Sequence, residues 1–224
     1  MISGYVSSHP DCVLGLATGS TPIGLYRCLV EDYEAGALSF KDVTSFNLDE
    51  YRGLDPQHDQ SYRYFMEHNL FSHVDIDPAR THVPDGACPD AAAACAAYEQ
   101  SIAEAGGLGL QLLALAPTAT SASTSPRPEF PKETHCVELT ESTINANSRL
   151  FDSIDDVPRE AYTMGIGTIM AAKEILVVAN GSDKADIVRR AFFGPVTPEV
   201  PASILQFHPN VTVVVDKEAG ALCQ

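Results

Sequence analysis

Residues 17–21 combine a glycine with small and hydroxyl side chains in a way that suits the binding of an anion. The segment reads ATGST and follows the apolar run VLGL. Gly19 permits a sharp turn. Ser20 or Thr21 can cap a following helix, whose first position suits Pro22. Such a loop directs free backbone N–H groups and hydroxyls toward one point, where phosphate is a natural guest. An ordinary strand-to-helix turn explains the loop equally well.

Two adjacent carboxylates, Asp49 and Glu50, follow the next apolar run in the motif FNLDEY. Successive side chains of a strand point to opposite sides, so one can face a site while the other faces solvent or a backbone partner. A carboxylate at a strand end beside a phosphate loop is a candidate general base for carbon acid chemistry. A helix cap or a solvated pair is the alternative, and spacing alone favours that alternative.

Basic residues are scarce, with 14 Lys and Arg against 30 Asp and Glu and a net charge of −16. A phosphate site in such a chain must therefore be built locally from a few cations. Arg149 could form a bidentate fork on a phosphate, and Lys184 could act as a point charge. Taken singly, each is an ordinary surface cation. His208, in a short apolar helix, is expected to be structural.

The elements that position these residues alternate along the chain. Strands are expected at residues 13–16, 43–48, 108–115, 136–139, 175–179 and 211–215, and helices at 22–35, 61–71, 89–105, 141–151 and 183–193. This alternation predicts a single α/β domain whose mostly parallel sheet carries helices on both faces. Ligands of such sheets bind beyond the carboxyl ends of the strands.

The first ten residues, MISGYVSSHP, form a helix fragment with no strand before it. We therefore expect an unpaired helix, a missing N-terminal edge strand and an exposed apolar sheet face near residues 13–16. Each 100 Å² of lost apolar burial removes about 2.5 kcal/mol of stabilisation before entropy is counted. The sequence thus predicts a domain of low stability.

The composition also argues against several classes of partner. A pI near 4.6 makes nucleic acid and anionic membranes poor partners. The six cysteines show no CxxC motif and no zinc-like spacing with the seven histidines, so we expect no metal. With no signal peptide and no apolar run long enough to span a bilayer, a cytoplasmic location is expected.

Together these motifs resemble one family, the glucosamine-6-phosphate deaminases. The matching segments are LGLATGSTP, FNLDEYRGL, SYRYFMEHNLF, ANSRLFD, TMGIGTIMAAKEILVVANGSDKA and ILQFHP, which follow in family order over nearly the whole chain. The resemblance implies a single Rossmann-like domain over residues 1–224, truncated at its N-terminus. It also implies hydrolysis of glucosamine 6-phosphate to fructose 6-phosphate and ammonia in amino-sugar catabolism, without a cofactor. A homo-oligomer is compatible with the sequence.

The resemblance also implies roles for individual residues. Those that would hold the sugar phosphate are Thr18, Gly19, Ser20, Thr21, Arg149 and Lys184. Asp49 would be the proton acceptor that moves a proton between C2 and C1 of the opened sugar. The neighbouring ammonium acidifies the C2 proton, and the enolamine product is neutral enough to need no metal. The resemblance therefore favours the base over the helix cap.

The chain departs from the family pattern within residues 114–128. Family members carry the loop Gly-His-Ile-Gly-Phe-Asn-Glu-Pro, preceded by Asp or Asn, and its His opens the sugar ring with the help of the acidic residues. Here the acidic, His and Glu positions are occupied by Thr118, Thr120 and Ser125. None of these side chains takes up or delivers a proton near neutral pH. We therefore expect severely impaired turnover.

The genetic code offers an explanation for this segment. The codons GGC CAC ATC GGC TTC AAC GAG CCC encode the family loop. Read one base later, they give Ala-Thr-Ser-Ala-Ser-Thr-Ser-Pro, which is the sequence of residues 119–126. Because family-like sequence resumes by about Glu133, we predict a compensated frameshift or a sequencing error. A genuine Ser/Thr-rich loop is the alternative, and codons that cannot be shifted into the family loop would establish it.

Two other functions stay open at this point. One is a catalytically dead sugar-phosphate binding or regulatory protein that keeps the phosphate loop. The other is a sister enzyme of the same fold, a phosphosugar isomerase or a phosphogluconolactonase. The motif FNLDEY argues against the lactonase. Ammonia release, compared with calorimetric binding of glucosamine 6-phosphate, separates a deaminase from a binding protein.

Overall fold

The short apolar runs form a six-stranded sheet in the computed structural model, which describes residues 1–115 and 129–223. The strands follow the order β4-β2-β1-β5-β8-β9, and every neighbouring pair is parallel. Their bounds are β1 Val13–Leu16, β2 Thr44–Asn47, β4 Thr81–His82, β5 Leu110–Ala114, β8 Glu174–Ala179 and β9 Val211–Val215. The predicted α/β fold with a mostly parallel sheet is confirmed.

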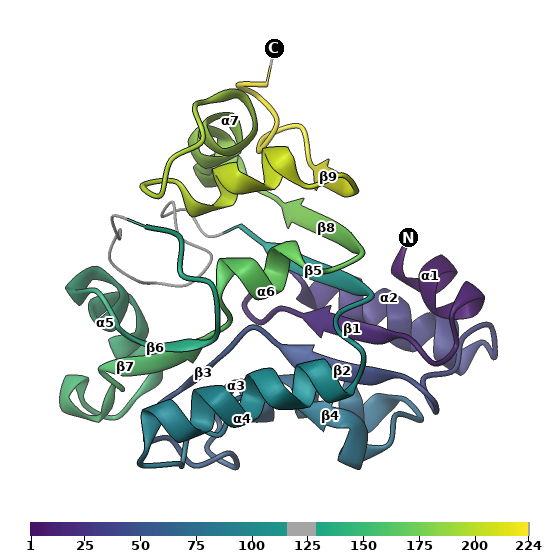
Figure 1. Cartoon of the computed structure of the whole chain (residues 1–224), viewed down its shortest axis with the longest axis horizontal. Helices are drawn as coiled ribbons and strands as arrows, with labels where there is room; N and C mark the ends of the chain where they lie inside the picture. The colour runs from purple at the N-terminus through teal and green to yellow at the C-terminus, as the bar shows by residue number, and fades with distance from the viewer. Residues whose placement is uncertain (116–128, 224) are drawn as a thin grey trace.

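Helices lie on both faces of this sheet, with α4 and α6 in front of it and α2 behind it in Figure 1. The helices are α1 Ile2–Ser8, α2 Ile23–Glu34, α3 Tyr62–Asn69, α4 Ala91–Glu104, α5 Glu141–Asn147, α6 Ile166–Met170 and α7 Ala185–Phe193. Gly36 follows α2 with φ +71°, and Gly106 and Gly107 follow α4 with φ +88° and +80°. Glycine adopts these left-handed conformations without strain, so the predicted helix ends are confirmed.

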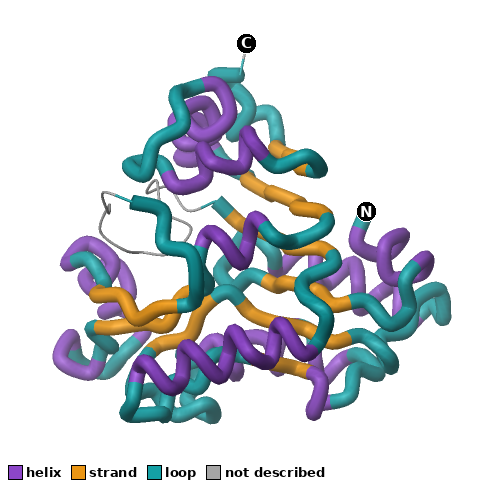
Figure 2. The backbone as a smooth tube through the Cα atoms, viewed as in Figure 1, coloured by secondary structure: helices purple, strands orange, loops and turns teal. Residues whose placement is uncertain are grey.

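A second, antiparallel sheet lies beside the first and was not predicted (Figure 2). It contains β3 Asp49–Tyr51, β7 Glu160–Thr163 and β6 His135–Glu138, in the order β3-β7-β6. The strand predicted at residues 136–139 is present as β6, but it belongs to this antiparallel sheet and not to the parallel sheet that the alternation predicts. The carboxyl ends of β1 and β2 point toward this second sheet (Figure 1). The region between the two sheets is thus the expected ligand side of the fold.

The expected exposure of apolar side chains near residues 13–16 is also wrong. β1 lies between β2 and β5, and Leu14 and Leu16 are each 1% exposed. The N-terminal helix is not loose either, because Ile2 and Val6 of α1 are buried in the main core. Gly15 permits close packing within the sheet, since a Cβ there would lie 2.0 Å from the Gln111 side-chain oxygen.

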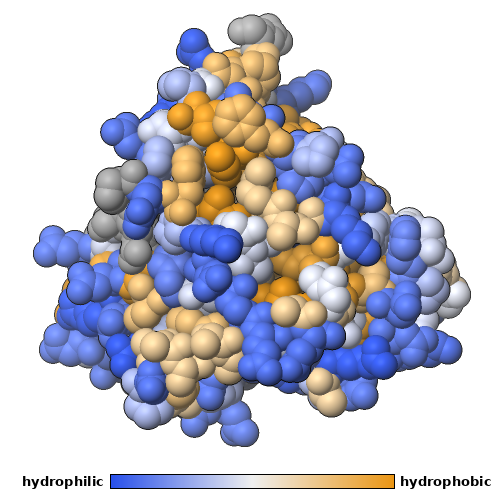
Figure 3. Space-filling model, in the orientation of Figure 1, coloured by the Kyte–Doolittle hydropathy of each residue, from blue (hydrophilic) through white to orange (hydrophobic). Residues whose placement is uncertain are grey.

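Most of the exposed large apolar side chains lie instead between residues 193 and 222. The exposed large apolar side chains there are Phe193, Phe207, Val213, Val214 and Leu222, and Figure 3 shows apolar residues in the same upper part of the molecule. Val213 and Val214 belong to the edge strand β9, whose outer side has no neighbouring strand among the described residues. None of the helices described by the structure is both long and apolar enough to span a bilayer.

Candidate active site

The loop of residues 17–21 has the sharp turn that its sequence predicts. Gly19 has φ +98°, and no side-chain hydrogen bond caps α2, which begins at Ile23 after Pro22. The expected cap by Ser20 or Thr21 is therefore wrong. Pro22 lacks an N–H donor and fixes its own φ, so it can start the helix without such a cap. The two hydroxyls are consequently not used to cap this helix.

Tyr26, which the sequence analysis missed, holds the start of this loop. Its side chain is fully buried, and its hydroxyl donates a hydrogen bond to the Ala17 carbonyl oxygen. The same hydroxyl accepts a hydrogen bond from the Ala17 N–H at 3.2 Å. Ala17 directly follows β1, so Tyr26 fixes the position at which the chain leaves the sheet.

Replacing Tyr26 by Phe is expected to lower the free energy of unfolding by about 1–3 kcal/mol, because both polar groups of Ala17 lose their buried partner. Chemical denaturation of the two proteins at one pH measures the difference. Tyr64→Phe is a matched control, since Tyr64 is 40% exposed and should lose almost nothing. Equal unfolding free energies for Tyr26→Phe and the unaltered chain would contradict this role.

Asp49 lies where the chain crosses from the parallel sheet to the second sheet. The Leu48 N–H binds the Leu16 carbonyl at 3.2 Å, and the Met164 N–H binds the Leu48 carbonyl at 2.7 Å. Asp49 then pairs with Thr163 of β7. Burial and the neighbouring charge of Glu50 raise the pKa of Asp49 to about 7, while a hydrogen bond from the Thr18 side chain opposes the shift. Asp49 therefore lies beside the loop of residues 17–21 as a carboxyl group whose pKa is close to neutral pH.

Glu50 has the other role that the sequence left open. Its side chain is 3% exposed and accepts hydrogen bonds from the Tyr62 and Arg63 N–H groups at 3.0 and 2.9 Å. These are the first two residues of α3. Each carboxylate therefore takes one of the two predicted roles. Asp49 faces the loop of residues 17–21, and Glu50 caps a helix.

The raised pKa of Asp49 predicts a pH-dependent effect on stability. In the folded protein Asp49 loses its proton with a pKa of about 7, whereas the ordinary pKa of an aspartate is 3.8. Ionisation therefore opposes folding, and the contribution present at low pH is lost as the pH rises through 7. Asp49→Asn is expected to be more stable than the unaltered chain by about 1–3 kcal/mol at pH 8, with no gain at pH 4.

Chemical denaturation at both pH values tests this prediction. The matched control is Asp155→Asn, because the Asp155 side chain is 90% exposed and should show no difference between the two pH values. A gain for Asp49→Asn that is equal at pH 4 and pH 8 would contradict the raised pKa.

The two candidate phosphate cations lie in short turns at different places in the fold. Lys184 ends the turn Ser182–Lys184 after β8; its side chain is 12% exposed, and its ammonium pairs with Asp183. Because β1 and β8 both flank β5, this turn lies at the same sheet edge as the loop of residues 17–21. Arg149 is exposed and lies in the turn Ser148–Leu150 after α5. That both cations converge on the phosphate loop stays a prediction.

Thr118, Thr120 and Ser125 lie outside the described residues. The last described residue before them is Leu115, whose N–H binds the Val178 carbonyl at 3.1 Å at the end of β5. β5 is the strand between β1 and β8. The described chain before these residues therefore ends at Leu115, beside the strand that lies between β1 and β8.

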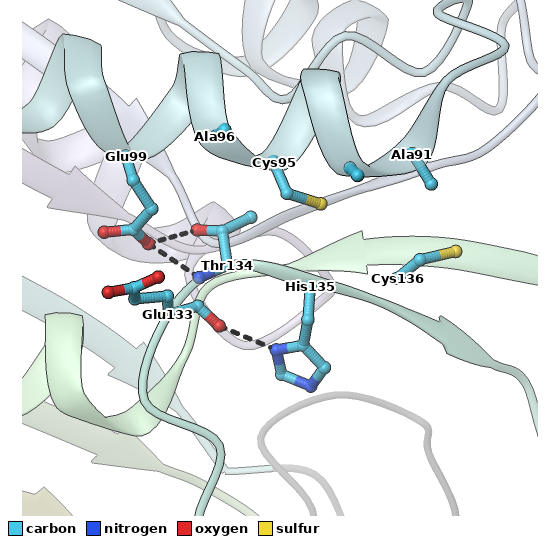
Figure 4. Close-up of a pocket in the computed structure, with 9 residues that line it drawn as sticks. Ala91, Cys95, Ala96, Glu99, Glu133, Thr134, His135 and Cys136 are labelled. Atoms are coloured by element: carbon cyan, nitrogen blue, oxygen red, sulfur yellow. Dashed lines mark hydrogen bonds between the residues drawn. The ribbon is translucent and has the colours of Figure 1, made fainter.

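A pocket of about 310 Å³ lies elsewhere, between α4 and β6 (Figure 4). Its acidic lining residues are Glu99 and Glu133, and no Lys or Arg lines the pocket. Glu99 accepts hydrogen bonds from the Thr134 N–H at 2.7 Å and from the Thr134 hydroxyl at 2.6 Å. An acidic lining repels a sugar phosphate, so we do not place the substrate there.

The described residues contain no group of three His, Cys, Asp or Glu side chains that could hold a metal ion.

His208 is 8% exposed, and its Nε2 lies 2.8 Å from the Ala172 carbonyl oxygen. This contact links the turn before β9 to the turn after α6. The sequence predicts such a structural role for His208.

Comparison with known proteins defines the class to which this fold and site belong. Residues 1–214 match the family described as glucosamine-6-phosphate isomerases/6-phosphogluconolactonase, and the chain belongs to that family. A 6-phosphogluconolactonase from Thermotoga maritima shares the fold, with a TM-score of 0.73 over 96% of this chain and 90% of that chain, at 19% identity.

Within this class, the more similar proteins are deaminases. The chain is 49% identical to a glucosamine-6-phosphate deaminase of Halothermothrix orenii, covering 99% of this chain and 92% of the relative. It is 52% identical to the deaminase of Lachnoclostridium phytofermentans, over 96% and 91% of the two chains. A solved monomeric glucosamine-6-phosphate deaminase matches 99% of this chain and 92% of its own, with 41% identity and a TM-score of 0.93. The resemblance to the deaminase enzymes is confirmed.

Proposed function

We propose that this chain binds glucosamine 6-phosphate between its two sheets and deaminates it slowly to fructose 6-phosphate and ammonia. The observation that carries the proposal is the position of Asp49, a base with a pKa of about 7 that accepts a hydrogen bond from Thr18 of the phosphate loop. A sugar whose phosphate rests on residues 18–21 would present its other end toward the sheet junction where Asp49 lies.

The proposed chemistry begins from the open-chain sugar. Asp49 removes the C2 proton, which the neighbouring ammonium group acidifies, and the ammonium passes a proton to the C1 oxygen, so that a neutral enolamine forms. Asp49 then delivers its proton to C1, which converts the enolamine into the protonated imine at C2. Addition of water to this imine releases ammonia and leaves fructose 6-phosphate. Thr18, Gly19, Ser20 and Thr21 hold the phosphate with Arg149 and Lys184. No step requires a metal or an organic cofactor.

The slow step of the proposed reaction is the opening of the sugar ring. At positions where the deaminases carry an acid, a His and a Glu, this chain has Thr118, Thr120 and Ser125. Hydroxyls cannot exchange protons with the ring oxygen and the anomeric hydroxyl near neutral pH. Turnover therefore depends on the small fraction of sugar that opens in solution. If that fraction is too small, the chain acts as a sugar-phosphate binding protein, which is the second candidate function.

Ammonia release from glucosamine 6-phosphate, measured together with calorimetric binding, tests the proposal. Binding with slow, Asp49-dependent ammonia release supports a deaminase, and binding with no release supports the binding protein. The absence of binding would contradict both functions. We further infer that the protein works in amino-sugar catabolism in the cytoplasm, where sugar phosphates are found.

Lys184→Ala is expected to weaken binding of glucosamine 6-phosphate by about 1.5–3 kcal/mol, the contribution of a charge-assisted contact to phosphate. Isothermal titration calorimetry measures the change. The control is Lys173→Ala, because Lys173 is exposed and lies just before β8, at the opposite end of the same strand. If both variants bind as tightly as the unaltered chain, Lys184 does not contact the phosphate.

A further inference from the structure

Glu50 is a buried carboxylate for which the proposed reaction has no use. Within the described residues, no Lys or Arg forms an ion pair with it; three backbone N–H groups bind it instead. Its Oε1 accepts from Tyr51 at 2.8 Å and from Tyr62 at 3.0 Å, and its Oε2 accepts from Arg63 at 2.9 Å. Both oxygens are thus acceptors, as expected for an ionised carboxylate at a helix N-terminus. Burial raises the pKa of Glu50, and these three backbone hydrogen bonds oppose that shift.

These hydrogen bonds join β3 to the start of α3 across residues 52–61. The same helix start is held by the Ser61 hydroxyl, which accepts from the Tyr64 N–H at 3.0 Å and donates to the Pro56 carbonyl at 2.8 Å. The Arg63 guanidinium binds both the carbonyl and the hydroxyl of Thr81 on β4. The junction of β3 and α3 is therefore anchored to the parallel sheet.

From this arrangement we infer that Glu50 is a positioning residue for Asp49. Its carboxylate, fixed on the amides at the start of α3, holds one side of the strand that carries Asp49, while β7 holds the other. It also keeps a negative charge one residue from the Asp49 carboxylate. The inference rests on the proposed role of Asp49 as the base.

The electrostatic part of this role follows from the groups around Asp49. The neighbouring titratable groups are Glu50 on β3, Tyr62 on α3 and Tyr98 on α4, and Thr18 contributes a hydroxyl. Burial raises the pKa of both tyrosines well above 10, so they stay neutral near pH 7. Glu50 is then the negative charge that disfavours ionised Asp49 and makes it a stronger base.

A purely structural role for Glu50 makes a different prediction. If Glu50 only caps α3, any change that loosens the start of this helix should affect Asp49 equally. Ser61→Ala removes the other cap of the same helix without changing the charge near Asp49. The pair Glu50→Gln and Ser61→Ala therefore separates loss of the charge from loss of the cap, and Glu50→Asp tests rescue by a shorter carboxylate.

The experiment is a ¹³C NMR titration of the Asp49 carboxyl carbon in the full chain and these variants. The unaltered protein should titrate near pH 7. Glu50→Gln should lower the midpoint by about one pH unit, a tenfold change in the acid dissociation constant. Ser61→Ala should leave the Asp49 midpoint unchanged. Glu50→Asp should give a midpoint close to that of the unaltered protein. No substrate is needed, so the result is independent of whether the chain turns over glucosamine 6-phosphate.

The inference is overturned if the Asp49 midpoint is the same in Glu50→Gln as in the unaltered chain, or if Ser61→Ala lowers it by the same amount. If Glu50→Gln does not fold, the carboxyl resonance of Glu50 is followed in the unaltered chain over the same pH range, and its protonation state tests the inference. Glu50 ionised throughout the titration of Asp49 supports the inference, and Glu50 protonated over that range overturns it.

Discussion

Replacing residues 118–126 by Asp-Gly-His-Ile-Gly-Phe-Asn-Glu-Pro is expected to raise the rate of ammonia release from glucosamine 6-phosphate by about 10²–10⁴-fold, the usual contribution of positioned acid–base catalysis. The replacement restores an acid at Thr118, a His at Thr120 and a Glu at Ser125. It keeps the length of the chain. The comparison is a steady-state ammonia assay of the two proteins.

A second replacement, identical except for Ala instead of His at Thr120, is the control for this experiment. It should restore the shape of the loop without its proton donor and should stay near the slow rate of the unaltered chain. If the complete family loop gives no increase, the slow step does not lie in ring opening, and the explanation of the impaired chain is wrong. An unaltered chain that already turns over at the rate of the restored protein would also contradict it.

Asp49→Asn in the loop-restored chain is expected to lower kcat by about 10²–10⁴-fold, because Asn cannot accept the C2 proton. Binding of glucosamine 6-phosphate should change little, since Asp49 lies at the sheet junction rather than on the phosphate loop. The activity of the restored chain itself should rise through pH 7 as Asp49 ionises. The assay is kcat and KM across pH 5–9.

Asp55→Asn is a suitable control for this variant, because Asp55 is an exposed carboxylate in the loop between β3 and α3. A restored chain that keeps its kcat after Asp49→Asn would require another residue as the base. A large rise in KM with an unchanged kcat would instead assign Asp49 to substrate binding.

The parallel sheet and the phosphate loop could be predicted because their signals are local. Val13, Leu14 and Leu16 form an apolar run beside a glycine turn, and both the strand and the positive φ of Gly19 are present. Asp49 was found because it follows such a run. Its relation to Thr18 was not predicted, since it depends on how β2 and β1 pair.

The second sheet could not be predicted, because β3, β6 and β7 are three or four residues long and their pairing is between distant parts of the chain. Such short strands carry little periodicity. The burial of β1 was misjudged for a similar reason, since the packing of Ile2 and Val6 depends on tertiary contacts. Tyr26 was missed as an anchor because its partner is a backbone group, which leaves no signal in the sequence. A backbone partner or helix cap was expected for one of the two adjacent carboxylates, but which of them takes that role depends on the position of α3.

The measurement that tests the account most directly is a calorimetric titration of the unaltered chain with glucosamine 6-phosphate and, in parallel, with glucosamine. The account predicts saturable binding of the phosphorylated sugar and none of glucosamine at the same concentrations, because the phosphate site is retained and only ring opening is impaired. Failure to bind glucosamine 6-phosphate, or equal binding of both sugars, would contradict it.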